Sequence, residues 1–500
     1  MIRVSLCWVV GRACITHDFF FDVTSLRTLI AKIRPPLFDS MRSWSHSVSI
    51  TICAKRGSVI STGSLVKRIS VISVLYIFLA FGTTNAQEAE KGQIPDSVRI
   101  LAIDEVTVLG KQNKAIVPAQ ILSGEKLQRL NSHSVSDALR YFSGVQIKDY
   151  GGIGGLKTVN IRSMGSQHVG VFYDGIQIGN AQNGTVDLGK FSLDNMELVS
   201  VYNGQKSDIF QSARDFASAS AVYMVTRRPA FESGRRNRFN VKLKGGSFDL
   251  INASALWEHR ISENLSSSAN IEYLNTSGKY KFRYHKDGGY DTTEVRRNGD
   301  VWFLRAEAAL FGKVKRGEWQ AKGYFYNSER GYPGAAVKKD YGISLLNEDR
   351  QKDRNFFFQG SLRQEVTDFY SYKIQAKYAN DYMNYVMPPE STVQPMDNHY
   401  WQQEVYVTAA NLFAFTSWWT ANLSTDFQWN KLDADGTDMF NAHFIEPRRY
   451  TLLGAIATSI NLKRFSMQAS LLYTYVHDRS ARRMETAPDK NVFSPTVVAS

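Results

Sequence analysis

The feature that most constrains this chain is a two-residue alternation of apolar and polar side chains after residue 229. Apolar residues occupy every second position of each run, and polar residues fill the positions between them. Alternation with this period predicts β-strands, because successive side chains of a strand point to opposite faces of a sheet. The runs are about ten residues long, the length that a tilted strand needs to cross a bilayer. The clearest runs are 239–244, 265–273, 319–325, 370–378 and 419–429.

The connections between these runs alternate between tight turns and long polar loops. Tight turns are expected at 262–264, 315–317, 367–369 and 462–464, and long loops at 275–299, 327–354, 380–399 and 431–449. Short turns at one end and long loops at the other are typical of membrane barrels, and a sheet in lipid must close on itself. We therefore expect residues 230–500 to form an antiparallel transmembrane β-barrel. The alternative is a soluble sandwich, which would carry polar residues on its outer face.

A basic pair and a short apolar run near the N-terminus indicate an export signal. Lys67 and Arg68 precede the apolar residues 69–82, and small residues then lead to Ala86. The apolar run is too short to span a bilayer as a helix. The pattern predicts a secretory signal peptide over 65–86, with a short buried helix as the alternative.

The segments on either side of this signal carry no recognisable fold. Residues 1–64 show no clear periodicity, and we interpret them as an extension from a start codon assigned too far upstream. All three cysteines lie there, and a body without cysteine suits an oxidising compartment. Residues 87–110 are polar, which predicts a flexible tail. Much of the formal net charge of +13 precedes residue 87, so the rest of the chain forms no basic stripe, and we expect no nucleic-acid partner.

Residues 111–229 have the pattern of a small α+β domain. Ser134 and Asp137 predict a capping box at the start of a helix. The glycine cluster at 151–155 leads into another strand, whereas a phosphate-binding loop would lead into a helix. Two turn pairs end strands further along, Asp174 with Gly175 and Asn203 with Gly204.

Six short motifs follow one another in a fixed order through this domain and the tail before it. They are Asp104 to Val108, Ser136 to Leu139, Val159 to Ser163, Val171 to Gly175, Met196 to Gly204 and Ala221 to Arg227. Their order and spacing resemble the plug domain of TonB-dependent outer-membrane receptors. The resemblance implies that residues 111–229 are a plug inside the barrel of 230–500, in the outer membrane of a Gram-negative bacterium.

The resemblance also implies roles for particular residues. It places a TonB box at Asp104, Glu105, Val106, Thr107 and Val108. Such a box would pair as an added strand with a TonB-type periplasmic protein that transduces energy. In the plug, we expect Arg162 and Asp174 to form internal charge contacts, and Gly175, Asn203 and Gly204 to shape the turns.

A barrel that encloses such a plug has around 22 strands, and this chain supplies fewer. We count about twelve strands after residue 229, and the last run, Val492 to Ser500, lacks a final aromatic residue. We therefore expect a partial barrel with about half of its strands, in a chain that is truncated or split.

No catalytic constellation is present, since the sequence contains neither HExxH nor GxSxG. We expect no enzyme activity, no cofactor and no metal site. The resemblance implies a receptor, embedded in outer-membrane lipid, for energised uptake of a scarce small molecule, a ferric siderophore or cobalamin. Two alternatives are open: a passive outer-membrane porin or adhesin, and a soluble secreted β-rich glycan-binding protein.

Overall fold

The computed structural model describes most of the chain after residue 118 and three short N-terminal strands. The described residues are 2–10, 13–21, 46–52, 119–130, 132–182, 184–232, 234–286, 290–333, 348–388, 395–436, 444–480 and 487–500. The chain divides into a unit of residues 1–54 and 111–500 and a unit of residues 55–110, and every described residue lies in the first. The predicted signal peptide of 65–86, the tail of 87–110 and its TonB box lie outside the described residues.

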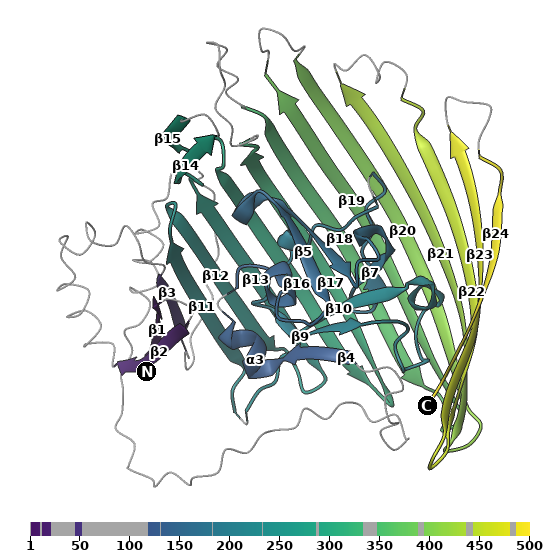
Figure 1. The fold of residues 1–500 in the computed structure, drawn as a ribbon. Coiled ribbons are helices and arrows are strands. Elements are labelled where there is room, and N and C mark those ends of the chain that lie inside the picture. Colours follow the sequence, from purple (N-terminus) through teal and green to yellow (C-terminus); the bar gives the residue numbers. More distant parts are fainter. Residues whose placement is uncertain are drawn as a thin grey trace, which may run out of the picture. The chain divides into compact units, whose positions relative to one another are not determined.

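The α+β domain is built on a five-stranded sheet (Figure 1). In spatial order its strands are β4 (Ala119–Ser123), β9 (Met196–Tyr202), β10 (Ser220–Thr226), β7 (Val169–Tyr173) and β8 (Ile176–Gln177). The pairing of β10 with β7 is parallel, and its pairing with β9 is antiparallel. The remaining elements are helices α3 (Gly124–Arg129) and α4 (Val135–Leu139), the hairpin of β5 (Val145–Tyr150) and β6 (Leu156–Ile161), and short 3-10 turns η2 (Gly152–Gly154), η3 (Ser166–His168), η4 (Leu188–Lys190) and η5 (Ala213–Ala217).

The core of this domain is apolar, as in a water-soluble protein. Leu139 of α4, Ile161 of β6, Val199 of β9 and Val222 of β10 are fully buried and belong to one cluster. Burial of this apolar surface provides the main favourable free energy for folding the domain. The expected α+β fold is confirmed.

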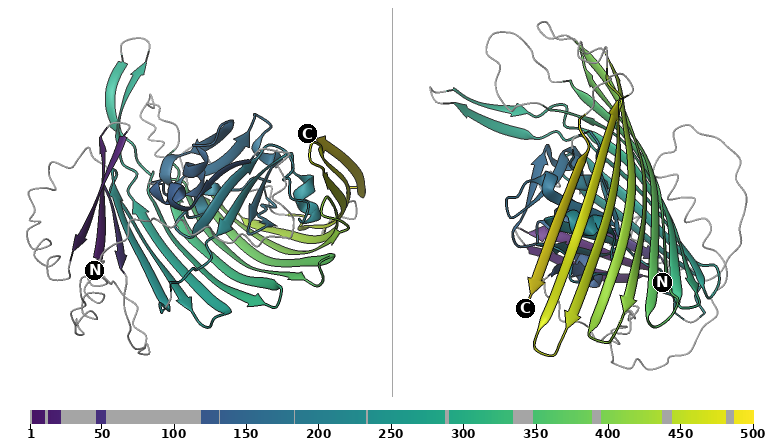
Figure 2. Two further views of the ribbon diagram at one scale, coloured as in Figure 1. Left: turned by 90° about the horizontal axis from the view of Figure 1, so that it is seen from below. Right: turned by 90° about the vertical axis from the view of Figure 1, so that its right-hand side faces the viewer.

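The second part is an antiparallel sheet of fifteen strands. Twelve of them, among the described residues, follow residue 229, in agreement with the number expected from the sequence. They are β11 (Asn237–Gly246), β12 (Leu250–Arg260), β13 (Leu265–Thr276), β16 (Val301–Val314), β17 (Gly317–Gly331), β18 (Arg350–Glu365), β19 (Tyr370–Met387), β20 (Met396–Ala414), β21 (Trp419–Gly436), β22 (Pro447–Asn461), β23 (Ser466–Ser480) and β24 (Lys490–Ala499). The strands β1 (Ile2–Val10), β2 (Ala13–Phe21) and β3 (His46–Ile52) extend the sheet beyond β11. The sheet curves, and the α+β domain lies on its concave side (Figure 2).

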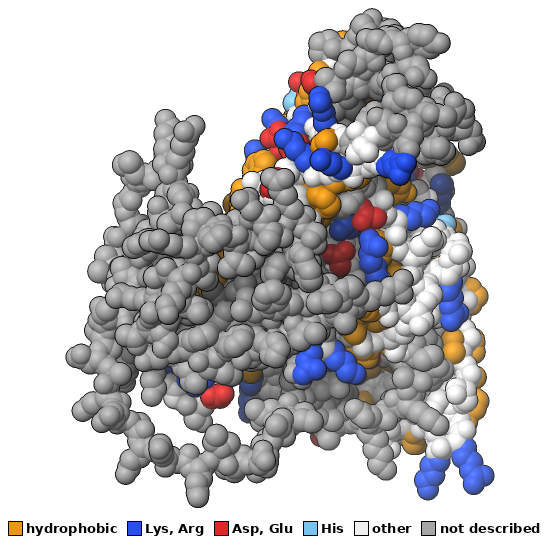
Figure 3. All heavy atoms as spheres, turned by 60° about the vertical axis from the view of Figure 1, so that its left-hand side comes forward, with side chains coloured by type: hydrophobic (Ala, Val, Ile, Leu, Met, Phe, Trp, Pro, Cys, Tyr) orange, Lys and Arg blue, Asp and Glu red, His pale blue; other side chains and the backbone are white. Residues whose placement is uncertain are grey.

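The two faces of this sheet are reversed relative to a soluble protein. In β21, Ser424 and Asp426 on the concave face are fully buried, whereas Leu423 and Phe427 on the convex face are 46% and 42% exposed. Hydrophobic side chains also line the right-hand edge of the surface in Figure 3. Apolar residues outside and polar residues inside are what a lipid-facing barrel wall requires, because lipid solvates only the apolar face. This arrangement contradicts the alternative of a soluble sandwich.

The strands are longer than the expected ten residues. From β16 to β23 they span 14 to 19 residues, so they extend into the segments expected to be loops at 327–354, 380–399 and 431–449. The loop expected at 275–299 contains a further hairpin, β14 (Lys281–Lys286) with β15 (Tyr290–Val295). Apolar alternation marks only the part of a strand that faces lipid. Backbone pairing can continue into water, where either face tolerates polar side chains.

The prediction of a capping box at Ser134 is wrong, because the hydrogen bonds that form there are different. The Asp137 carboxylate accepts from the Ser134 hydroxyl at 3.1 Å and from the His133 backbone N–H at 3.2 Å. The Ser134 side chain makes no capping bond to the helix. Its hydroxyl lies 2.6 Å from that of Ser136 instead. The glycines at 151–155 do lead into strand β6, as expected.

Among the residues that the structure describes, no helix has the length and apolar character needed to span a membrane.

Replacing Ile456 with arginine is expected to destabilise the sheet by about 2–4 kcal/mol, the cost of a cation on the lipid face near the bilayer midplane. Ile456 lies within β22 and is 61% exposed on the convex face. The control is Leu462→Arg, in the turn after β22, where exposure is 51% and the cation reaches water. Urea titration in lipid vesicles measures the free energy of unfolding. Equal effects of the two substitutions would contradict the assigned lipid face.

Candidate functional site

A cluster of buried polar groups joins the α+β domain to the large sheet. We call Tyr173, Asp174, Glu307 and Lys322 the anchor cluster. The Tyr173 hydroxyl, at the end of β7, donates to Glu307 Oε2 at 2.8 Å. The Lys322 ammonium, on β17, lies 3.2 Å from Glu307 Oε2 and 3.3 Å from the centre of the Tyr173 ring. Lys322 and Glu307 are almost completely inaccessible to solvent, so each charge depends on the other for compensation.

Asp174 extends the anchor cluster to several strands at once. Its carboxylate accepts from the backbone N–H and the hydroxyl of Thr226, both at 2.7 Å, and lies 3.5 Å from Lys322 Nζ. It also accepts from Gln320 Nε2 at 3.1 Å, and its carbonyl oxygen accepts from Gln375 Nε2 at 3.1 Å. One turn of the domain is therefore held by β10, β17 and β19.

The backbone of this turn explains the residue types found there. Asp174 has φ 51° and Gly175 has φ 81°, both in the left-handed region. A Cβ atom on Gly175 would lie 3.1 Å from both Gln375 Nε2 and Lys373 Nζ. Glycine is needed here because the sheet approaches the turn closely and because the left-handed conformation strains other residues.

Further ion pairs hold the segment between β8 and β9 against the sheet. Arg305 and Glu272, both inside the sheet, pair at 2.7 Å, and Arg305 also donates to the Gly189 carbonyl. Asp194 accepts from Lys242 Nζ at 2.6 Å. Burial opposes ionisation of Asp194, but Lys244 and Lys242 outweigh it and hold the pKa of that carboxyl well below its usual range.

The turn η5 provides a second attachment, on β21. The backbone N–H groups of Ala213 and Arg214 donate to the two carboxylate oxygens of Asp426, at 3.1 and 2.7 Å. Ser212 and Asp215 form a capping box at the start of this turn, which the sequence analysis did not identify. Burial raises the pKa of the Asp215 carboxyl. The signal was present as a Ser-x-x-Asp spacing, but no helical periodicity follows it.

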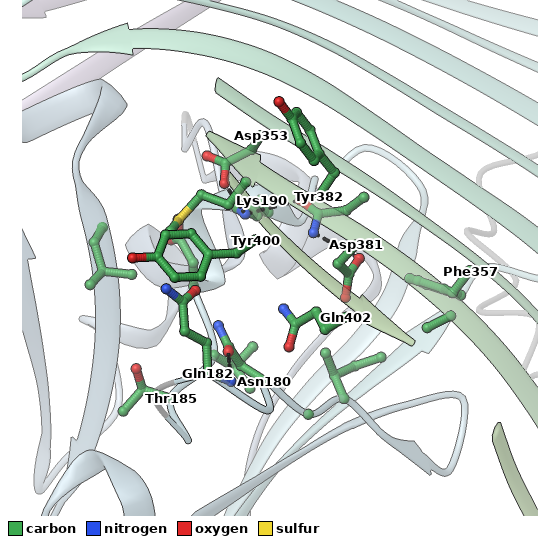
Figure 4. Close-up of a pocket in the computed structure, with 18 of the residues that line it drawn as sticks. Asn180, Gln182, Thr185, Lys190, Asp353, Phe357, Asp381, Tyr382, Tyr400 and Gln402 are labelled. Atoms are coloured by element: carbon green, nitrogen blue, oxygen red, sulfur yellow. Dashed lines mark hydrogen bonds and ion pairs between the residues drawn. The ribbon is translucent and has the colours of Figure 1, made fainter. Parts of the chain in front are cut away.

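A cavity of about 260 Å³ lies where the segment after β8 faces strands β17 to β20. We call it the loop-end cavity, because its lining comes from the end of β17 and β19 and the start of β18 and β20, beside the longer connections of the sheet. Asn180, Gln182 and Thr185 line it from the domain, and Tyr382, Tyr400 and Gln402 line it from β19 and β20 (Figure 4). The lining combines polar and aromatic side chains with aliphatic ones such as Ile178 and Val186, as expected of a site that binds a small molecule and orients it by a few hydrogen bonds.

The predicted plug residues lie in different environments, some in contact with the large sheet and others exposed. Asp174 and Gly175 belong to the turn described above. The Arg162 side chain is exposed, and within the described residues it forms no ion pair, although its backbone N–H donates to the Gly144 carbonyl. Asn203 and Gly204 follow β9, and Gly204 has φ 119°. The expected internal charge contact of Arg162 is therefore not observed there, because the left-handed turn at this residue leaves the side chain in solvent.

Sequence analysis missed the partners that the sheet contributes. Glu307 and Lys322 are charged residues at inward positions between small residues, such as Ala306, Ala308 and Ala321. That pattern could have marked them, but their pairing depends on strand register. In the described part of the chain, no group of His, Cys, Asp and Glu side chains has the arrangement of a metal site.

Comparisons with known proteins agree with this architecture. Residues 111–214 match the family model of the TonB-dependent Receptor Plug Domain. The vitamin B12 transporter BtuB of Vibrio vulnificus is 23% identical over 306 residues, which cover 61% of this chain and 43% of that protein. This chain therefore spans less than half the length of that relative.

Two solved structures have the same fold. The copper transporter OprC superposes with a TM-score of 0.57 and 13% identity, over 78% of this chain and 60% of that chain. The unliganded ferric citrate transporter FecA superposes with a TM-score of 0.54 and 13% identity, over 76% of this chain and 59% of that chain. At this level of identity the likeness shows a shared plug-and-barrel fold.

Replacing Lys322 with methionine is expected to weaken the attachment of the α+β domain by about 3–5 kcal/mol, because it leaves buried Glu307 without its cation. Hydrogen exchange of the β7 amides should become faster, and the double change Lys322→Met with Glu307→Gln should restore part of the protection. The control is Lys463→Met, an exposed cation in the turn after β22. Unchanged β7 protection in the Lys322→Met variant would show that the anchor cluster does not hold the domain.

Proposed function

We propose that this chain, which belongs to the TonB-dependent receptors, takes up a scarce small molecule across the outer membrane of a Gram-negative bacterium. The ligand class is a ferric siderophore or a cobalamin, and the energy comes from a TonB-type periplasmic protein. The observation that carries this proposal is the loop-end cavity, whose lining is shared by the plug and the barrel strands.

The plug fills the concave side of the strand array through buried contacts. Polar and charged side chains of β16 to β21 are engaged with plug atoms through the anchor cluster, Arg305 and Asp426. These contacts would have to break or rearrange for the plug to move aside and open a path for a ligand. Breaking several buried charge contacts is costly, which supports an energised receptor over the passive porin.

The loop-end cavity connects ligand binding to the plug. Lys190 reaches into it from the plug and lies 3.2 Å from Asp353 on β18. The plug backbone N–H of Ala181 donates to Gln402 on β20 at 2.8 Å. A ligand that contacts Gln402 or Asp353 would compete with these contacts, so binding from outside can bias the position of the plug.

The predicted TonB box supplies the connection to the periplasmic partner. The acidic and β-branched residues at 104–108 precede the plug in the sequence and suit pairing as an added strand. Pulling on a strand that immediately precedes the plug would load the plug contacts directly.

Replacing Val106 with proline is expected to reduce transport to background while ligand binding is retained. Proline removes a backbone donor and interrupts strand pairing with the partner. Uptake of radiolabelled ligand by intact, energised cells measures transport. The amount of ligand that de-energised cells retain measures binding. The matched control is Ala89→Pro, which lies in the same tail before the box and should leave transport unchanged.

Two results would count against the proposal. Transport that survives Val106→Pro would refute the assignment of the box. Uptake that is indifferent to a proton uncoupler would favour the passive porin instead.

A further inference from the structure

Every cation that lines the loop-end cavity already has a carboxylate partner. Lys190 lies 3.2 Å from Asp353, and Lys377 lies 2.9 Å from Glu404. Arg330 lies 3.1 Å from Asp353 and 3.6 Å from Asp187. These pairs also donate to plug atoms, since Lys377 Nζ donates to the Gln177 carbonyl and Arg330 to the Gly154 carbonyl.

One carboxylate of the cavity has no such cation. Asp381, on β19, accepts from Asn355 Nδ2 at 2.8 Å. Among the described residues it takes part in no ion pair, and its side chain is directed toward the cavity near Tyr382 and Gln402 (Figure 4). Asn355 is itself oriented by Lys190, whose ammonium donates to Asn355 Oδ1 at 2.9 Å. The amide therefore turns its N–H groups toward Asp381, and a carboxylate has capacity for further donors.

The described lining therefore carries four acidic side chains and three basic ones. They are Asp187, Asp353, Asp381 and Glu404, against Lys190, Arg330 and Lys377. A polyanionic ligand would have to take a cation from a buried pair, which leaves a carboxylate uncompensated. It would also place negative charge beside Asp381, where a shielded cavity screens repulsion weakly.

We propose that the loop-end cavity selects a neutral or cationic ligand that donates a hydrogen bond to Asp381, and discriminates against polyanionic metal chelates. This proposal deepens the proposed receptor function and rests on it. The remaining lining is consistent, because Asn180, Gln182 and Gln402 offer uncharged donors and acceptors and Tyr400 offers an aromatic face. Specificity would come from the single carboxylate rather than from a cluster of free cations.

The test compares two probes on the purified full chain. One is cyanocobalamin, a neutral corrinoid with peripheral amide donors, and the other is a trianionic ferric tris-catecholate. The wild-type chain should bind the neutral probe at least about tenfold more tightly, as expected if one hydrogen bond to a charged acceptor decides the preference. Asp381→Asn should reduce that ratio by about tenfold or more, through weaker binding of the corrinoid, stronger binding of the trianion, or both.

The matched control is Asp435→Asn, which removes the same charge from an exposed position near the end of β21, outside the cavity lining. It should leave the ratio unchanged. Equal or tighter binding of the trianion by wild type, or a ratio unaffected by Asp381→Asn, would overturn the charge selection. Uncoupler-sensitive uptake of the trianion would then show that the receptor function itself stands. Failure of both probes to bind and to be taken up would contradict the selection and the receptor function together.

Discussion

The two faces of the strand array meet different surroundings, lipid on the convex face and a folded domain on the concave face. The rest of the structure depends on this difference. Lipid outside solvates only apolar side chains. It offers no hydrogen-bond partner, so every backbone N–H and C=O group at that depth must be paired within the sheet. The opposite face is then free to be polar, and in this chain it is covered by a folded domain rather than by water alone. Asp426 on β21 shows the consequence, since it is buried yet accepts two backbone N–H groups from the plug. Because the apolar side chains of the sheet face lipid, the polar and charged side chains of the opposite face are free to contact the plug.

That interface combines many hydrogen bonds and apolar contacts with several buried charge contacts. A soluble core gains stability from many small apolar contacts, and partial disruption costs little at each step. The anchor cluster instead concentrates charge compensation at Glu307 and Lys322. Such contacts hold firmly when complete and are lost together when one member leaves. This behaviour suits the proposed receptor function, in which the plug would stay in place at rest and change position as a unit.

The sequence alone predicted the features that repeat along the chain. Period-two alternation located the strands and identified the lipid face, because each strand carries the same signal independently. Strand ends were not predicted, since pairing continues past the lipid-facing part, as in β19 and β20. The motifs of the plug located helix α4 and the turns at 174–175 and 203–204 but not helix α3, and the hydrogen bonds of Ser134 went to neighbours that the pattern could not specify.

Contacts between the two parts were the least predictable from the sequence. Glu307 is paired across the sheet with Tyr324, and Lys322 with Ala309, so the two charges meet on a diagonal. The contact between the two charges depends on the register of β16 and β17. It also depends on the position of Tyr173, which precedes Glu307 by 134 residues in the chain. The loop-end cavity combines residues of four strands, β17 to β20, with residues of the plug in the same way. No local pattern encodes such a combination.

The most direct measurement is spin-label accessibility along β21. A chain without its three native cysteines would carry single labels at successive positions from 421 to 428 in lipid vesicles. The account predicts that odd positions are accessible to oxygen dissolved in lipid, whereas even positions are shielded from both oxygen and a water-soluble nickel complex. Odd positions that are accessible to the nickel complex would show water on the convex face and contradict the account.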